Sequence, residues 1–246
     1  MLEIRHENMV DTKATQEAYN KIYSNQGIIH KDSFYLWLIK LLKPSKGNLL
    51  IDISCGQGRL VTLAERLGLR TIGVDFALAG VQIGKEETPE SSWVVGDGEL
   101  LPLADACVDY VTHIGSLEHY INPALGAKEI ARILKPNGIA CIMLPNSFGL
   151  LGNIIYVLRT GDIFDDGQPL QRYGTRAAWE KILEDGGLSV KKVINYSEID
   201  LPKTMPDAID LLRKPHKVIR YLINLFIPIN WANQFVFLCS RDQDEK

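Results

Sequence analysis

Three carboxylates stand at the ends of three apolar segments in the first half of the chain. Asp52, Asp75 and Asp97 each follow a short apolar run, the pattern of a strand buried on both faces of a parallel sheet. Parallel strands end at one edge of their sheet, so we expect these side chains to lie near one another, where open α/β sheets bind ligands. A carboxylate suits an ammonium group or sugar hydroxyls and repels a phosphate.

A glycine turn follows the first of these acids. The order is Asp52-x-Ser54-x-Gly56-x-Gly58, and apolar residues then recur at helical spacing. In the dinucleotide fingerprint the glycines come directly off the strand and a third glycine follows. Here a carboxylate precedes the turn and Val61 stands at the third position, so the turn suits an ammonium group better than a pyrophosphate.

The second acid, Asp75, lies roughly 20 residues beyond the turn, as a ribose-binding carboxylate does in this kind of sheet. We therefore expect Asp75 to bind the 2′- and 3′-hydroxyls of a ribose, and Phe76 beside it to pack on an adenine.

These segments resemble landmarks of a known family. The turn is similar to motif I of class I S-adenosylmethionine-dependent methyltransferases, with Ser54 where the first glycine usually stands. Gly96-Asp97-Gly98-Glu99-Leu100-Leu101-Pro102 resembles the G-D-x-x-x-L-P segment of the ubiquinone/menaquinone C-methylases, the methyltransferase type 11 family. Glu118-His119 after a strand, and the turn 134–138, are also frequent in that family. The resemblance is continuous up to Pro145.

The resemblance implies S-adenosylmethionine as cofactor and S-adenosylhomocysteine as product. In the family the acid at Asp97 accepts a hydrogen bond from the adenine amine, and the tip of the fourth strand lies beneath the methyl donor. We expect the Ser54 hydroxyl to bond the cofactor's carboxylate. The residues expected to contact the cofactor are Asp52, Ser54, Cys55, Gly56, Gly58, Asp75, Phe76, Asp97, Gly98, Glu99, Ile114, Gly115, Ser116 and Tyr19.

Glu118 and His119 are the candidate catalytic residues. An imidazole with a pKa near ~6.5 is suited to remove a proton from a substrate hydroxyl or acidic carbon. His119 equally suits a helix cap or a bond to the backbone, and Glu118 suits a structural role. Because the sulfonium already activates its methyl group, positioning carries most of the acceleration and no obligatory catalytic set is expected. The sequence leaves open whether the acceptor atom is O, N or C.

The expected fold is α/β, with a Rossmann-like, seven-stranded, mostly parallel sheet, helices on both faces and an antiparallel last strand. One domain spans 1–246. The helices of 1–45 are expected to cover the cofactor, and insertions at 146–176 and 200–232 to form a substrate cap. Tyr19 and Tyr23 suit either a lid over the cofactor or packing between helices.

Composition narrows the function further. With 27 basic and 30 acidic residues the net charge is −3, so a nucleic-acid partner is not expected. The four cysteines show no C-x-x-C spacing, which disfavours a metal site and indicates a cytoplasmic protein. The apolar insertions favour a small-molecule acceptor with a hydrophobic portion. No transmembrane segment is expected, and the basic amphipathic stretch 214–226 suits either a membrane surface or capping of the core.

Two alternatives remain open at the level of sequence. One is a nicotinamide-dependent oxidoreductase on a similar sheet, and the other is a non-catalytic scaffold that binds S-adenosylmethionine.

Overall fold

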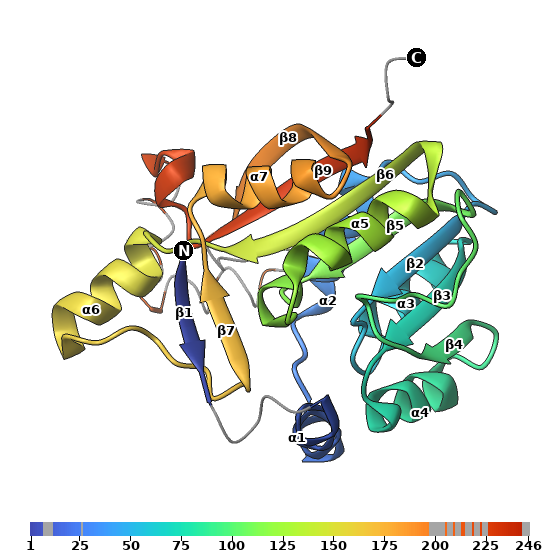
Figure 1. Ribbon diagram of the computed structural model, residues 1–246, viewed down its shortest axis with the longest axis horizontal. Helices are drawn as coiled ribbons and strands as arrows, with labels where there is room; N and C mark the ends of the chain where they lie inside the picture. The colour runs from blue at the N-terminus through green and yellow to red at the C-terminus, as the bar shows by residue number, and fades with distance from the viewer. Residues whose placement is uncertain are drawn as a thin grey trace.

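The computed structural model describes residues 1–6, 12–25, 27–196 and 226–242, with isolated positions 205, 209, 213, 214, 218 and 222. A seven-stranded sheet forms its centre, in the order β4-β3-β2-β5-β6-β9-β8 (Figure 1). The strands are β2 (Leu49–Ile53), β3 (Arg70–Asp75), β4 (Ser92–Val95), β5 (Val108–Ile114), β6 (Leu134–Pro145), β8 (Leu188–Tyr196) and β9 (Gln234–Arg241).

The pairing of these strands confirms the fold class. β2 is parallel to β3 and to β5, β3 is parallel to β4, and β5 is parallel to β6. β9 pairs antiparallel with both β6 and β8. The sheet is therefore mostly parallel, and its last strand in chain order is inserted antiparallel between two others, as expected.

Helices cover both faces of the sheet. Buried residues of α5 (Pro123–Ile133) and α7 (Arg176–Asp185) pack with one face, where Trp179 is fully buried. Those of α2 (Asp32–Leu41) and α3 (Arg59–Arg66) pack with the other face around Leu38 and Leu60. α4 (Leu78–Glu87) lies beside β3 and β4, and α1 (Thr12–Asn25) packs against α4 (Figure 1). The inner strands β2, β5 and β9 are thus mostly buried, which explains their apolar character, whereas the edge strands β4 and β8 are partly exposed.

A second, two-stranded sheet lies at the carboxyl end of the main one. β1 (Leu2–Arg5) pairs antiparallel with β7 (Leu170–Tyr173) (Figure 1). Neither strand is among the elements expected from the sequence. β7 continues into Gly174, which bridges to Asn146 at the end of β6, so the small sheet is attached to the central one.

The first predicted insertion, 146–176, is structured rather than a plain loop. It holds a π-helical turn (Leu150–Ile154), α6 (Ile155–Thr160) and β7. Most of the second insertion, 200–232, and of the stretch 214–226 lies outside the described residues, so both remain predictions. Within the described part of the chain, no helix is long and apolar enough to cross a membrane.

Candidate functional site

A cavity of about 670 Å³ opens at the carboxyl ends of the parallel strands. This size is typical of sites for small molecules and cofactors. Of the residues predicted to contact a cofactor, the structure brings these to its wall: Tyr19, Asp52, Ser54, Cys55, Gly56, Asp75, Phe76, Asp97, Gly98, Glu99, Ile114, Gly115 and Ser116. Glu118 and His119 also line it.

Gly58 is the predicted site residue that does not line this cavity. Its φ of 74° lies in the left-handed region, and a Cβ there would collide with the indole of Trp93. Gly73 and Gly84 also face Trp93, and a Cβ at either would collide with the ring. In the structure Gly58 therefore makes room for a side chain of β4.

Asp52 is a buried carboxyl group at the end of β2. It is 5% exposed, and its Oδ1 accepts a hydrogen bond of 2.6 Å from the Thr112 hydroxyl. Burial raises the pKa of Asp52 to about 7, although the Thr112 bond favours the ionised form. A cationic ligand group would stabilise the carboxylate here.

Asp75 fixes the glycine turn to the next helix. One carboxylate oxygen accepts from the Gly56 N–H at 2.7 Å and the other from the Ala77 N–H at 2.8 Å. Burial raises the pKa of Asp75 to about 6, and the two backbone bonds oppose that rise. Each oxygen keeps a second lone pair for a hydroxyl of a ligand.

Asp97 stands at the exposed rim of the cavity, where its carboxylate accepts from the Glu99 N–H at 2.9 Å. Glu99 in turn accepts from the Asn122 N–H at 3.1 Å. Gly98 is buried between them, and a Cβ there would collide with the Tyr120 phenol. The β4 end of the cavity is thus shaped by a tyrosine that sequence reasoning missed.

Ser54 and Tyr120 of the cavity wall form a hydrogen-bonded chain with His113, which is buried behind them. The Tyr120 phenol lies 2.9 Å from Ser54 Oγ and 2.9 Å from His113 Nε2. Ser54 has a φ of 56°, a conformation that a glycine adopts more readily. The Ser54 hydroxyl is hydrogen-bonded to Tyr120 and also lines the cavity, so its bond to the cofactor's carboxylate stays a prediction. Burial lowers the pKa of His113 to about 3, so its imidazole is neutral.

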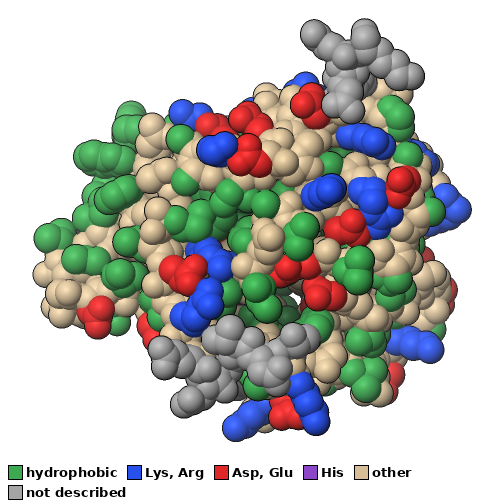
Figure 2. Space-filling model, viewed as in Figure 1, with side chains coloured by type: hydrophobic (Ala, Val, Ile, Leu, Met, Phe, Trp, Pro, Cys, Tyr) green, Lys and Arg blue, Asp and Glu red, His purple; other side chains and the backbone are tan. Residues whose placement is uncertain are grey.

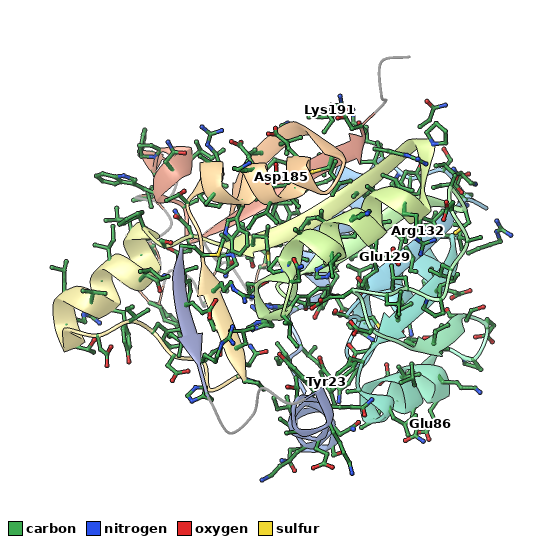
Figure 3. The ribbon with its side chains drawn as sticks, viewed as in Figure 1. Tyr23, Glu86, Glu129, Arg132, Asp185 and Lys191 are labelled. Carbon is green, nitrogen blue, oxygen red and sulfur yellow. The ribbon has the colours of Figure 1, made fainter. Side chains whose placement is uncertain are left out.

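The aromatic residues of α1 lie over the turn. Tyr19 and Tyr23 both line the cavity, and a Cβ at Gly56 would lie 3.0 Å from the Tyr23 ring. Tyr23 projects from α1 in Figure 3. The Tyr19 hydroxyl donates to Gln168 Oε1 at 2.9 Å. α1 therefore contacts both the glycine turn and the segment before β7.

The cavity wall also includes Glu118 and His119. Both lie on a 3-10 turn (Leu117–His119) after β5. Both side chains are less than a tenth exposed. His119 Nδ1 bonds the Leu170 carbonyl of β7 at 2.5 Å, and its Nε2 lies 3.9 Å from Glu118 Oε1. Burial raises the pKa of Glu118 to about 8 and lowers that of His119.

Arg172 of β7 holds this turn in place. Its guanidinium donates to the carbonyl oxygens of Glu118, Tyr120 and Ile121. Its Nε donates to Glu3 of β1 at 2.8 Å. The small sheet therefore supports the part of the cavity wall that carries Glu118 and His119. No pattern in the sequence could have linked Glu3 to this turn.

Metal ligands are not grouped in the described residues. No cluster of three or more His, Cys, Asp or Glu side chains in that part of the chain is arranged to hold a metal ion.

Part of the chain is similar in sequence to known methyltransferases. Residues 51–142 match the methyltransferase domain family. A curated relative, demethylmenaquinone methyltransferase of Staphylococcus aureus, is 29% identical over 152 residues. The match covers 54% of this chain and 63% of that protein, so the chain spans less than two thirds of its relative's length.

Two solved structures share the fold across nearly their whole length. The [4+2]-cyclase SpnF has a TM-score of 0.69 at 16% identity, covering 94% of this chain and 97% of its own. Geranyl diphosphate C-methyltransferase from Streptomyces coelicolor, solved with S-adenosyl-L-homocysteine, has a TM-score of 0.64 at 15% identity, covering 92% and 98%. At such identities the likeness establishes the fold alone.

The sheet order, the antiparallel β9 and the cavity at the strand ends define a Rossmann-like methyltransferase fold. Residues 51–142 are similar to a methyltransferase domain, and this match supports the class I S-adenosylmethionine-dependent methyltransferase family predicted from the sequence.

Proposed function

We propose that the chain transfers a methyl group from S-adenosylmethionine to a small-molecule acceptor. The observation that carries this proposal is the convergence of Asp52, Asp75 and Asp97 on one cavity, beside the Gly56 turn. The match of residues 51–142 to a methyltransferase domain supports it independently.

The residues at the strand ends fit the proposed cofactor. Asp52 is a buried carboxyl group with a raised pKa, a site that an ammonium group would complete. Asp75 would accept from the ribose hydroxyls, and Asp97 from the adenine amine at the rim. When bound, the cofactor supplies a sulfonium-activated methyl group. The chain's own task is then to align the acceptor and exclude water.

The acceptor half of the cavity suits a proton-removing role for His119. Its Nδ1 is engaged by the Leu170 carbonyl, so Nε2 is the nitrogen that takes a proton from the acceptor. Gly115 and Ser116 at the tip of β5 would lie between cofactor and acceptor. We further propose that α1 covers the cofactor through Tyr19 and Tyr23.

Apolar side chains of the 146–176 insertion support an acceptor with a hydrophobic portion. Leu151, Ile155, Tyr156 and Phe164 line the cavity at this end. The curated relative is named for a quinone acceptor, and we infer only a shared preference for a partly apolar small molecule. We propose that this insertion acts as the substrate cap.

Calorimetry with S-adenosylhomocysteine tests the cofactor assignment. We expect micromolar binding to the wild type, unchanged binding to Glu86→Gln, whose side chain is exposed on α4 (Figure 3), and weaker binding to Asp52→Asn. Absence of heat with the folded wild type would overturn the proposal. Binding of NADH instead would favour the oxidoreductase alternative, and binding without methyl transfer to any of a broad acceptor panel would favour the scaffold.

A further inference from the structure

Glu118 is a buried carboxyl group without a full set of hydrogen bonds. It is 4% exposed and lines the cavity. Its Oε2 has no hydrogen-bond partner among the residues that the structure describes. Buried polar atoms are nearly always hydrogen-bonded. The unpaired Oε2 therefore indicates that a ligand in the cavity forms the missing hydrogen bond.

Glu118 and His119 do not satisfy each other. Glu118 Oε1 lies 3.9 Å from His119 Nε2, which is too long for a hydrogen bond. A Cβ at Gly115 would lie 3.8 Å from the same Oε1, so the carboxyl group faces the tip of β5. Two polar groups therefore stand side by side at the place where the proposed function puts the acceptor.

The two groups differ in hydrogen-bonding character. A carbonyl oxygen only accepts, so the bond to Leu170 requires His119 Nδ1 to carry the proton. The neutral imidazole then offers a lone pair at Nε2. Burial raises the pKa of Glu118 to about 8, and nearby Asp166 adds to the rise, so at neutral pH this carboxyl group donates an O–H.

The charge of the wall restricts the ligand further. The cavity is lined by the acids Asp52, Asp75, Asp97, Glu99, Glu118 and Asp166. Arg159 is the one Lys or Arg side chain among the described residues of the lining, and it lies on the exposed part of α6. An anionic acceptor would meet carboxylates without a buried cation. The wall thus favours an uncharged compound.

We propose that the acceptor is an uncharged hydroxylated ring compound with two neighbouring oxygens. One oxygen accepts a hydrogen bond from the Glu118 carboxyl group, and the other donates its O–H to His119 Nε2. This inference rests on the proposed function and names its substrate class. In the transfer, the second oxygen forms a bond to the methyl carbon while the S–CH₃ bond breaks. The S–C electron pair stays on sulfur, and the hydroxyl proton moves to His119 Nε2.

Three small probes test this arrangement on protein saturated with S-adenosylhomocysteine. Catechol carries two neighbouring hydroxyls, phenol carries one, and benzoate is an anion of similar size. We expect catechol to bind at least tenfold more tightly than phenol by calorimetry, and benzoate to give no heat. With S-adenosylmethionine in place of the product, catechol should yield its mono-methyl ether.

Variants of Glu118 separate the two contacts. Glu118→Gln keeps a donor and should keep the preference for catechol, whereas Glu118→Leu should lower catechol affinity to that of phenol. Glu86→Gln is the matched surface control. The affinity for S-adenosylhomocysteine checks that each variant is folded.

Equal binding of catechol and phenol by the wild type, tight binding of benzoate, or an unchanged preference in Glu118→Leu would each overturn the inference. These outcomes leave the proposed function standing as long as S-adenosylhomocysteine binds. Loss of that binding in the wild type would overturn the proposed function itself.

Discussion

Asp52 illustrates how burial changes the proton affinity of a single side chain at the edge of the sheet. The carboxyl group is buried with one hydrogen bond from Thr112, and burial raises its pKa to about 7. A bound ammonium group would favour the carboxylate, so binding would release the proton that Asp52 carries in the free protein.

The affinity for S-adenosylhomocysteine should therefore depend on pH. Between pH 6 and 7.5 the ligand's ammonium group stays charged while Asp52 ionises, so we expect affinity to rise about five- to tenfold with pH. Asp75, with a pKa raised to about 6, acts in the same direction. Calorimetry at several pH values measures the rise, and Asp52→Asn should show a smaller one. A wild-type affinity that is constant over this range would contradict the role given to Asp52.

Trp93 connects three elements through their glycines. Its indole from β4 packs against Gly58 before α3, Gly73 of β3 and Gly84 of α4, where any Cβ would collide with the ring. Trp93 Nε1 also donates to the Thr88 carbonyl at 3.0 Å. These contacts fix α3 and α4 relative to the sheet edge that carries Asp75.

Gly84→Ala should therefore destabilise the protein, although alanine is the better helix former. Overpacking of this kind typically costs about 1–3 kcal/mol, against a helix-propensity gain of roughly 1 kcal/mol. Thermal or urea unfolding measures the difference. In a Trp93→Leu background the same substitution should become neutral or stabilising, because the ring is gone. A stabilising effect in the wild-type background would show that the ring moves aside.

The elements differ in how far the sequence predicts them. The central strands are rich in apolar residues, and they were predictable, with the acids at their ends and Gly56, because each of these signals is local in the sequence. β1 and β7 escaped prediction because each is a four-residue strand whose partner lies far along the chain. Arg172 gives no sign in the sequence that it holds the turn of Glu118 and His119.

Tyr120 was missed for a related reason. The pattern that drew attention to Glu118 and His119 ends one residue before it. Its phenol lies between Ser54 and His113, which belong to different strands or turns, so the contact exists only after β2 and β5 have paired. The sequence shows that Ser54 replaces a glycine of the family motif, but this replacement does not indicate that Tyr120 is its hydrogen-bond partner.

Exposed apolar side chains are distributed unevenly over the surface of the molecule. Large apolar side chains are exposed around α6, including Val157, Leu158 and Phe164, and Figure 2 shows hydrophobic groups gathered at the end of the molecule where α6 lies. Tyr156 and Phe164 also line the cavity. The apolar surface therefore continues into the cavity, which supports the proposed acceptor with a hydrophobic portion.

Buried acids with raised pKa values should make the free protein less stable as pH rises from 7 to 8.5. Asp52 and Glu118 have pKa values of about 7 and about 8, so the folded state holds protons that the unfolded chain has already lost. Stability then falls with pH. The lowered pKa values of His113 and His119 act in the opposite direction, but mainly below pH 7. We expect a net loss of about 1–2 kcal/mol.

A series of thermal unfolding curves measures this loss. Tm should fall by roughly 2–8 °C over the range, and Glu118→Gln should remove most of the fall. A Tm that rises with pH, or a Glu118→Gln variant that behaves as the wild type does, would contradict the assignment of a neutral Glu118.

The position of β9 has a consequence for biosynthesis. It follows every other strand of the central sheet along the chain, yet it lies between β6 and β8 and pairs with both. Until it leaves the ribosome, those two strands present open, apolar edges to whatever surrounds the nascent polypeptide. The sheet is thus completed only when β9 inserts between β6 and β8, and the growing chain should depend on chaperones until that strand is in place.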